Sequence, residues 1–496
     1  MKALKELLKD SLTYGLTDAL SRIISFLLIP LYTSYLTPSD YGIISLVAYV
    51  YTFFLVIASF GTTNAIFRRY NIHQHHNEQT ETLSTSSLFL LITSSFLLVI
   101  AKTFSEEISR SILGTTDYEE LINIAILGAF FNCLGNVFQV ILRAQRKVKK
   151  IAVISLLKLV LTISTTIYLV VVVEMGVKGV ILANAAGAIL TSVLLFLMSR
   201  RALSFSFKLQ ELKALLLYGI PFIPHKIISQ VSLFLPAFLL RNYIGLDAAG
   251  LYDISLKFAL PLGFIVSSIQ KSWVPMKFQI HREEDLEKRK STFSNLISAY
   301  FIGVGFVCCA YSLVGPEILR LMTSSAEYKE AALYLPFVLL ITFATGFYFM
   351  MGTGFENTDN PKELPIASML ALVLIFGIGF SFTPIIGILA VIFAVFIAFL
   401  SQGLLMRYFS IKKFHIPLNT RLIFLITFSA VLFSTISHFI QRQSFSYRWN
   451  FILVIYLFLF IIIVVILRNK RTLILKKYGH LFKRMSFLRF LFKSSN

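Results

Sequence analysis

Long apolar segments fill most of this chain and decide what it can fold into. They fall at 12–36, 41–66, 84–101, 120–142, 151–173, 177–198, 214–240, 248–270, 293–315, 331–354, 365–383, 387–406, 422–440 and 449–467. A helix needs about 20 apolar residues to cross roughly 30 Å of hydrocarbon. Because 56% of the 496 residues are hydrophobic and only 14% are charged, a soluble core could not bury this surface. The sequence predicts an all-α polytopic membrane protein with about 14 transmembrane helices.

The basic residues predict how these helices are oriented. If both termini are cytoplasmic, 34 of the 46 Lys and Arg residues lie in inside segments and 8 lie in outside loops. Cytoplasmic loops of membrane proteins carry such an excess. The same distribution explains the net charge of +21, so it argues against a nucleic-acid partner. The tail at 469–496 is basic and contains no acid, which suits a helix lying on anionic inner-leaflet lipids.

The two halves of the chain repeat each other. Matching positions include Tyr14 and Tyr218, Gly15 and Gly219, Arg22 and Lys226, Tyr35 and Tyr243, and Gly42 and Gly250. In the pair formed by Arg22 and Lys226, a base recurs as a base. The repeat predicts two structurally related halves.

Six ionisable residues interrupt the apolar spans. They are Asp18, Arg22, Lys158, Lys226, Asp253 and Lys257. A charge near the bilayer centre costs about 2.5 to 3.5 kcal/mol, so these side chains should face protein or water. The spacing of four residues in Asp18/Arg22 and in Asp253/Lys257 places each acid and base on one helix face.

These charges have two interpretations. In the structural one, each acid neutralises its neighbouring base, while Lys158 reaches the inside surface with its long side chain. In the functional one, they line a water-filled cavity between the halves, whose formal charge of +2 attracts a phosphate or another anionic head group. We favour the functional interpretation for Arg22 and Lys226, because Lys226 lies deep in its span with no acid on its own helix.

Amide side chains extend the polar set. Asn132, Asn136 and Gln139 follow one another at spacings of four and three, which keeps them on one side of a helix. Asn184 and Gln230 lie in other spans. These amides either hold helices together or line the predicted cavity together with the four bases.

Nothing in the sequence points to an enzyme, a metal or a cofactor. The predicted outside loops are short, and the chain has neither a phosphate-binding glycine loop nor HExxH. The three cysteines lie in apolar segments without metal-ligand spacing, so we expect small buried side chains. His73, His75 and His76 lie in a polar loop, and their spacing is not specific for a metal.

Three stretches resemble one family of transporters. The run from Arg22 to Gly42 (RIISFLLIPLYTSYLTPSDYG), the stretch Arg143–Lys147 (RAQRK) and the stretch Pro384–Gly387 (PIIG) resemble Wzx-type polysaccharide flippases. These belong to the multidrug/oligosaccharidyl-lipid/polysaccharide exporter superfamily. The resemblance implies six-helix bundles at 1–204 and 205–415 related by an axis along the membrane normal, further helices in 416–468, and the tail at 469–496.

The resemblance also implies a function. Such a protein moves undecaprenyl-diphosphate-linked oligosaccharide, for example O-antigen units, across the bacterial cytoplasmic (inner) membrane by alternating access. A proton or sodium ion is the expected coupling ion, with Asp18 and Asp253 as candidate carriers by analogy. Polysaccharide-assembly proteins are expected partners. The span at 365–383 lacks the asparagines that many relatives show, so no cargo contact is expected from it.

The sequence also allows two other transporter functions and one enzyme function. A peptidoglycan-precursor (lipid II) flippase has a cargo with the same diphosphate, and a multidrug exporter belongs to the same superfamily. The exporter is disfavoured because the spans sum to +2. A membrane-embedded polysaccharide polymerase or ligase is disfavoured because no catalytic constellation lies on a sizeable outside loop.

Overall fold

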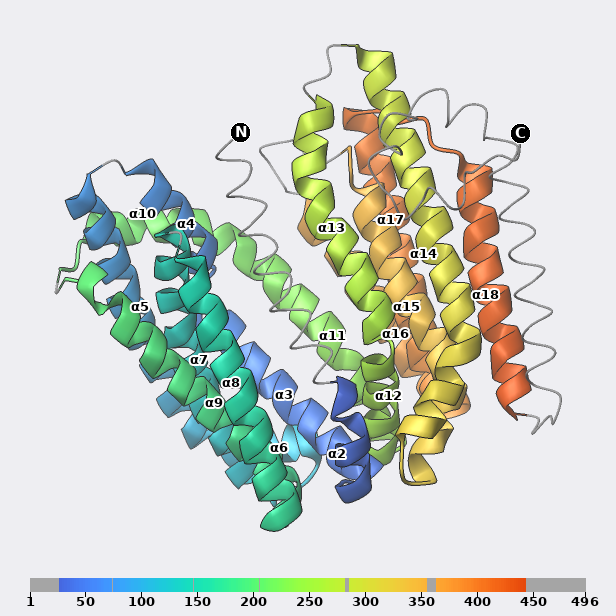
Figure 1. Cartoon of the computed structure of the whole chain (residues 1–496), viewed down its shortest axis with the longest axis horizontal. Coiled ribbons are helices and arrows are strands. Elements are labelled where there is room, and N and C mark those ends of the chain that lie inside the picture. The colour runs from blue at the N-terminus through green and yellow to red at the C-terminus, as the bar shows by residue number, and fades with distance from the viewer. Residues whose placement is uncertain are drawn as a thin grey trace, which may run out of the picture. The chain divides into compact units, whose positions relative to one another are not determined.

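The computed structural model describes residues 26–73, 75–145, 147–204, 206–281, 285–354 and 363–442. Within these residues every regular element is a helix (Figure 1). Eleven described helices are long and apolar enough to cross a membrane, or twelve if one bent pair is a single span. The protein is therefore an all-α polytopic membrane protein, as the sequence predicts. Asp18, Arg22, the span at 449–467 and the basic tail lie outside the described residues, so the count of fourteen stays a prediction.

Residues 1–438 form one unit, and 439–496 form a second one. The first unit begins with α2 (Ile29–Tyr35), α3 (Pro38–Ala58), α4 (Thr62–Ile72), α5 (His76–Thr103), α6 (Ser105–Leu113), α7 (Glu119–Ala144), α8 (Val148–Ile167), the π-helix η1 (Tyr168–Val172) and α9 (Gly176–Ser199). Helix α3 starts with a capping box, in which Thr37 and Asp40 each accept a hydrogen bond from the other's backbone N–H. Helix α7 packs against α3, α5 and α9, and their apolar side chains form one core.

The passage to the second half is broken into short pieces. It contains the 3-10 turn η2 (Arg200–Ala202), α10 (Leu209–Gly219), the 3-10 turn η3 (Ile220–Phe222) and α11 (Ile223–Tyr243). The predicted span at 214–240 thus contains a break, which lies at Pro221 and Pro224 because proline removes backbone hydrogen bonds. Helix α10 packs on α4 and α5, whereas α11 packs on α3, α12 and α16.

The second half continues with α12 (Leu246–Phe258), α13 (Leu260–His281), α14 (Leu286–Met322), η4 (Glu327–Glu330), α15 (Ala331–Met351), α16 (Glu363–Ile386), α17 (Ile388–Lys413) and α18 (Thr420–Arg442). Helices α12 and α13 meet at a bend of 52°. Pro261, the second residue of α13, has no N–H to continue the backbone ladder of α12. Helix α15 is largely buried, and it packs on α14 and α17.

The two halves meet mainly through α3. This helix of the first half packs along α11 and α12 of the second half, and Figure 1 shows α3 (blue) beside α12 (green).

Candidate functional site

The contact between α3 and α12 is made backbone to backbone at two glycines. A Cβ atom on Gly42 would lie 2.2 Å from the carbonyl oxygen of Leu246, and one on Gly250 would lie 1.8 Å from that of Pro38. No side chain fits at either position, so both helices need glycine here. Pro38 and Leu246 are separated by the same number of positions as Gly42 and Gly250, which the sequence repeat matches. The contact is therefore formed by equivalent positions of the two halves.

One turn further along, a charged pair lies at the same contact. Lys257 Nζ is 2.9 Å from Asp253 Oδ2, which confirms the predicted placement of both residues on one face of α12. Ser45 Oγ of α3 donates a hydrogen bond of 3.3 Å to Asp253 Oδ1, across a sequence separation of 208. The Lys257 ammonium also lies 4.1 Å from the ring centroid of Tyr41 on α3. The second half supplies both charges, and the first half supplies neutral partners.

We call this set the axis contact: Tyr41, Gly42, Ser45, Gly250, Asp253 and Lys257. Tyr41 is buried, and its hydroxyl has no hydrogen-bond partner among the described residues. Its ring meets that of Tyr328 edge to face, with centroids 5.6 Å apart. Tyr328 in turn donates a hydrogen bond of 2.7 Å to the carbonyl of Leu36. Polar and aromatic contacts thus close the two halves against each other around the glycines.

Contacts between the halves continue on both sides of the axis contact. The hydroxyl oxygens of Ser34 and Ser324 lie 2.8 Å apart near the loop that follows α2. In the opposite direction, Gln230 of α11 donates a hydrogen bond of 2.7 Å to Thr52 of α3. Gln230, a predicted cavity residue, therefore joins the two halves in this conformation.

Lys226 lies nearer the start of α11. It is half-buried, and no carboxylate of the described part of the chain lies within 4.0 Å of its ammonium. The preceding residue, His225, is tied to the second half, because its Nδ1 lies 3.1 Å from Ser368 Oγ of α16. Gln402 of α17 donates a hydrogen bond of 3.2 Å to the same hydroxyl. As the sequence shows, α11 itself carries no acidic residue that could pair with Lys226.

Three of the predicted amides lie close to polar groups of the first half. The side chain of Asn132 lies near the hydroxyl group of Tyr51 of α3. Gln139 accepts a hydrogen bond of 3.1 Å from Arg143 on its own helix. The amide of Asn184 donates to a backbone carbonyl one turn earlier, at 2.9 Å. The hydrogen bonds of Gln139 and Asn184 each stay within one helix, so neither of them joins two helices.

Asn136 and Lys158 have different surroundings. Asn136 and Cys133 line a small pocket between α3, α4, α5 and α7, which belongs entirely to the first half. Lys158 is half-buried on α8, and its stem passes Gly187 of α9, where a Cβ atom would lie 3.7 Å from Lys158 Cγ. Within the described residues no carboxylate lies within 4.0 Å of this ammonium.

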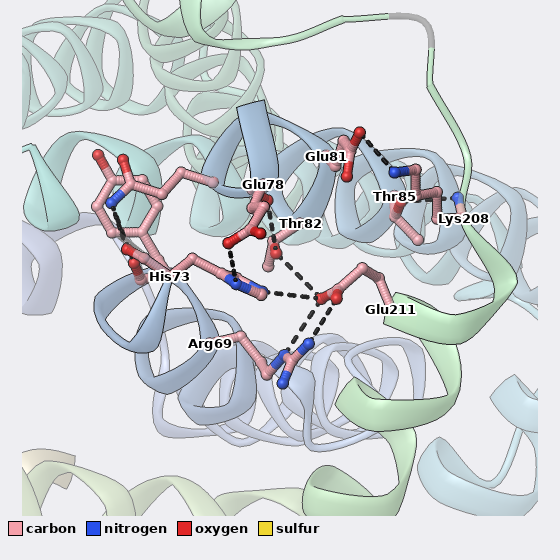
Figure 2. A network of polar contacts seen from close by, with 10 residues as sticks. Arg69, His73, Glu78, Glu81, Thr82, Thr85, Lys208 and Glu211 are labelled. Carbon is pink, nitrogen blue, oxygen red and sulfur yellow. Dashed lines mark hydrogen bonds and ion pairs between the residues drawn. The ribbon is translucent and has the colours of Figure 1, made fainter. Parts of the chain in front are cut away.

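Sequence reasoning missed an ion-pair network at the start of α10. Figure 2 shows Arg69 of α4 binding Glu211 of α10 through two nitrogens, at 2.5 and 3.2 Å. Thr82 of α5 donates a further hydrogen bond of 3.1 Å to this carboxylate. His73 has one ring nitrogen 3.4 Å from Glu211 and the other 2.9 Å from Glu78. We call these residues the α10 clasp, because they fasten α10 to the first half.

One further ion pair and two backbone contacts also hold α10 against the first half. Lys208, just before α10, pairs with Glu81 at 2.7 Å, and its N–H donates to Thr85 at 3.1 Å. At the far end of α10, Gly219 lies against Gly61, where a Cβ atom would be 2.3 Å from the Gly219 carbonyl oxygen. Gly61 also has a positive φ of 68°, so glycine is favoured there twice.

His73, one of the three histidines considered for metal binding, belongs to the α10 clasp. His73 faces two carboxylates, but the described residues contain no group of three or more His, Cys, Asp or Glu side chains that could hold a metal ion. Cys133, Cys308 and Cys309 are buried free thiols, as predicted from their apolar segments.

Comparison with known proteins gives the chain a family. The polysaccharide biosynthesis protein family matches residues 33–325. The succinoglycan biosynthesis transport protein ExoT of Rhizobium meliloti (strain 1021) is 23% identical over 318 residues, which are 63% of this chain and 62% of ExoT. The match therefore spans less than two thirds of that relative.

Solved structures share the fold. The lipid II flippase MurJ in an inward closed conformation superposes with a TM-score of 0.72 at 16% identity, over 92% of this chain and 99% of MurJ. An inward-facing multidrug resistance transporter of the MATE family of the MOP superfamily gives a TM-score of 0.67 at 16% identity, over 78% of this chain and 93% of that one. These likenesses establish a fold shared with MOP-superfamily transporters. From the match over more than half of its length, the chain belongs to the polysaccharide biosynthesis protein family.

Proposed function

We propose that this protein is a flippase that carries undecaprenyl-diphosphate-linked oligosaccharide repeat units from the cytoplasmic to the outer face of the bacterial inner membrane. Its family, a relative named as a polysaccharide transport protein, and a fold shared with a lipid flippase support the proposal. Movement by alternating access between the halves 1–204 and 205–415 requires no chemical step, so the protein acts as a transporter and not as an enzyme.

The environment of Lys226 carries the proposal. A half-buried ammonium without a carboxylate from the described chain is costly in a membrane protein, and an anionic cargo lowers that cost. Lys226 is placed on α11, the helix that packs on α3 of the first half and on α16 and α17 of the second. A diphosphate bound there contacts the helix that joins the two halves. Arg22, its repeat partner in the sequence, is proposed as a second contact.

The predicted orientation in the membrane indicates at which face the halves are closed. The excess of Lys and Arg in the loops predicts that Thr37, Gly245 and Ser324 lie on the outer side. The axis contact then closes the halves near the outer face in this conformation. We propose that cargo enters from the cytoplasmic side and that the axis contact opens to release it.

Replacing Lys226 tests the proposal directly. We expect Lys226→Gln to reach the membrane in normal amounts but to abolish surface polysaccharide in a host whose own copy of this gene is deleted. The matched control is Lys213→Gln on the neighbouring α10, since Lys213 is exposed. Normal export by Lys226→Gln, or equal loss in both variants, contradicts the assigned role.

A lipid II flippase is the second candidate, because MurJ aligns over nearly the whole chain. Rescue of two hosts separates the two functions. Growth of a strain depleted of its lipid II flippase favours the second candidate, whereas restored surface polysaccharide in a strain lacking its oligosaccharide flippase favours the first.

Ion coupling stays a separate proposal. The Asp253 carboxylate already binds the Lys257 ammonium, so a proton or sodium ion acting here has to compete with a resident cation. If Asp253 carries the coupling ion, Asp253→Asn flattens the pH or sodium dependence of transport in vesicles. An unchanged profile removes it from this role. Asp18 is the other candidate by analogy.

A further inference from the structure

We propose that Lys257 is a further anion contact, which Tyr41 covers while the outer end is closed and which becomes available to the cargo diphosphate when the halves separate there. This inference rests on the proposed function. It extends it by assigning an anion site to the outer half of the transport cycle.

The geometry of the axis contact supplies the first argument. The Lys257 side chain is 33% exposed, and its ammonium has Asp253 at 2.9 Å on one side and the face of Tyr41 on another. An ammonium has three hydrogens to donate, and an aromatic face satisfies such a donor only weakly. Asp253 belongs to the same helix, but Tyr41 belongs to the other half. Separation of α3 from α12 therefore removes Tyr41 and leaves Asp253 in place.

The energetics make this exchange feasible. A cation over a single aromatic ring is only modestly stabilised. Charge-assisted hydrogen bonds are roughly twice as strong as neutral ones, so a phosphate oxygen is a better partner for the freed ammonium than the ring. Since Ser45 contributes only a neutral donor to Asp253, opening the contact leaves no charge without its partner.

The sequence repeat supplies an independent argument. Ser45 and Asp253 are 208 positions apart in the sequence, and so are Tyr49 and Lys257. Tyr49 is therefore the residue of the first half that is equivalent to Lys257 in the repeat. Tyr49 packs edge to face on Phe234, with centroids 5.8 Å apart. At this repeat position α12 carries a cation and α3 carries a tyrosine, so the proposed anion site moves with α12.

A labelling experiment tests the change in accessibility without reference to cargo chemistry. The substitutions Ser34→Cys and Ser324→Cys place two thiols where hydroxyl oxygens lie 2.8 Å apart, so their disulfide holds the outer end closed. Lys257→Cys is combined with this disulfide, or with Ala at both crosslinking positions. Outward-oriented vesicles are treated with an anionic, membrane-impermeant thiol reagent, and modification at position 257 is read by peptide mass spectrometry. We expect the disulfide to slow modification several-fold, and equal rates overturn the proposal.

A charge-neutral double variant tests the anion contact itself. Lys257→Gln alone leaves Asp253 without its base, so it is compared with Asp253→Asn/Lys257→Gln, in which no charge remains. We expect both to lose surface polysaccharide and Lys257→Arg to retain most of it. Recovery of export in the double variant shows that Lys257 only neutralises Asp253, and this overturns the proposal.

Controls keep the outcomes distinct. Lys178→Gln removes a partly exposed lysine that pairs with Glu120 at 2.6 Å, and it should leave export unchanged. The membrane content of each variant is measured to exclude misfolding. If the unaltered protein itself fails to restore export, the proposed function fails, while the labelling experiment still reports whether position 257 becomes accessible.

Discussion

The axis contact and the α10 clasp are built from different interactions. At the axis contact the two halves share glycine backbones, a serine hydrogen bond and an aromatic face, while both charges stay on α12. At the α10 clasp a full ion pair joins α10 to α4, with Arg69 binding Glu211 through two nitrogens. Partly buried bidentate ion pairs are costly to separate, whereas the neutral contacts are individually weak.

This difference indicates which contacts change during transport. Helix α10 is fastened to the first half, while α11 is tied to α16 through His225 and Ser368. The chain between them passes through η3, which contains Pro221 and is followed by Pro224. We expect the relative movement of the halves to be taken up at this break, with the α10 clasp kept and the axis contact opened.

The largest expected effect comes from filling the glycine contact. Gly250→Val places a side chain where a Cβ atom already lies 1.8 Å from the Pro38 carbonyl, so the closed outer end should lose about 3 kcal/mol and export should fall to background. The readout is surface polysaccharide together with the membrane content of the protein. Gly377→Ala is the matched control, since nothing lies within 4 Å of its Cβ position. Equal behaviour of the two variants contradicts the backbone contact.

Breaking the α10 clasp should cost stability before it costs export. Glu211→Gln leaves Arg69 with a neutral partner in a poorly exposed setting, and we expect a loss of about 2 kcal/mol, seen as a lower melting temperature in detergent. Glu106→Gln breaks an exposed pair with Arg110 at 2.9 Å and should change the melting temperature very little. A stability of Glu211→Gln equal to that of the control shows that the clasp does not hold α10.

The smallest expected effect concerns a neutral hydrogen bond between the halves. Gln230→Leu removes the donor to Thr52, which is worth about 1 kcal/mol, and it should change the export rate only a few-fold. The rate is compared with that of Thr52→Val, which removes the acceptor. If either variant abolishes export while remaining abundant, Gln230 contacts the cargo, as the sequence prediction had it, and does more than join the halves.

The membrane spans were predictable because about 20 apolar residues in a row have few other uses. The position of the Asp253–Lys257 pair was also predictable, since a spacing of four fixes both residues on one helix face. The bend between α12 and α13 could be predicted only in part. Pro261 indicates that a kink can form there, but a proline does not set the direction of a kink.

The partner residues in the α10 clasp and in the axis contact could not be predicted from the sequence. Arg69 and Glu211 are 142 residues apart, and neither position differs in type from many other surface charges. Tyr41 covers Lys257 only because the glycines bring α3 and α12 together. The helical spacing predicted that Asn132 shares a face of α7 with Asn136 and Gln139. It did not predict that Tyr51 of α3 lies near Asn132. Such contacts depend on packing between distant segments, which hydrophobic patterning does not encode.

The most direct test of the central claim is a translocation measurement on the crosslinked protein. Purified protein with the substitutions Ser34→Cys and Ser324→Cys is reconstituted in vesicles with undecaprenyl-diphosphate-linked oligosaccharide. Glycan that reaches the opposite face is detected with an impermeant glycosidase. We predict that the oxidised protein moves no glycan, that reduction restores transport, and that each single cysteine variant transports normally. Equal transport before and after reduction, with the disulfide confirmed by mass spectrometry, would show that the contact between α3 and α12 does not have to open.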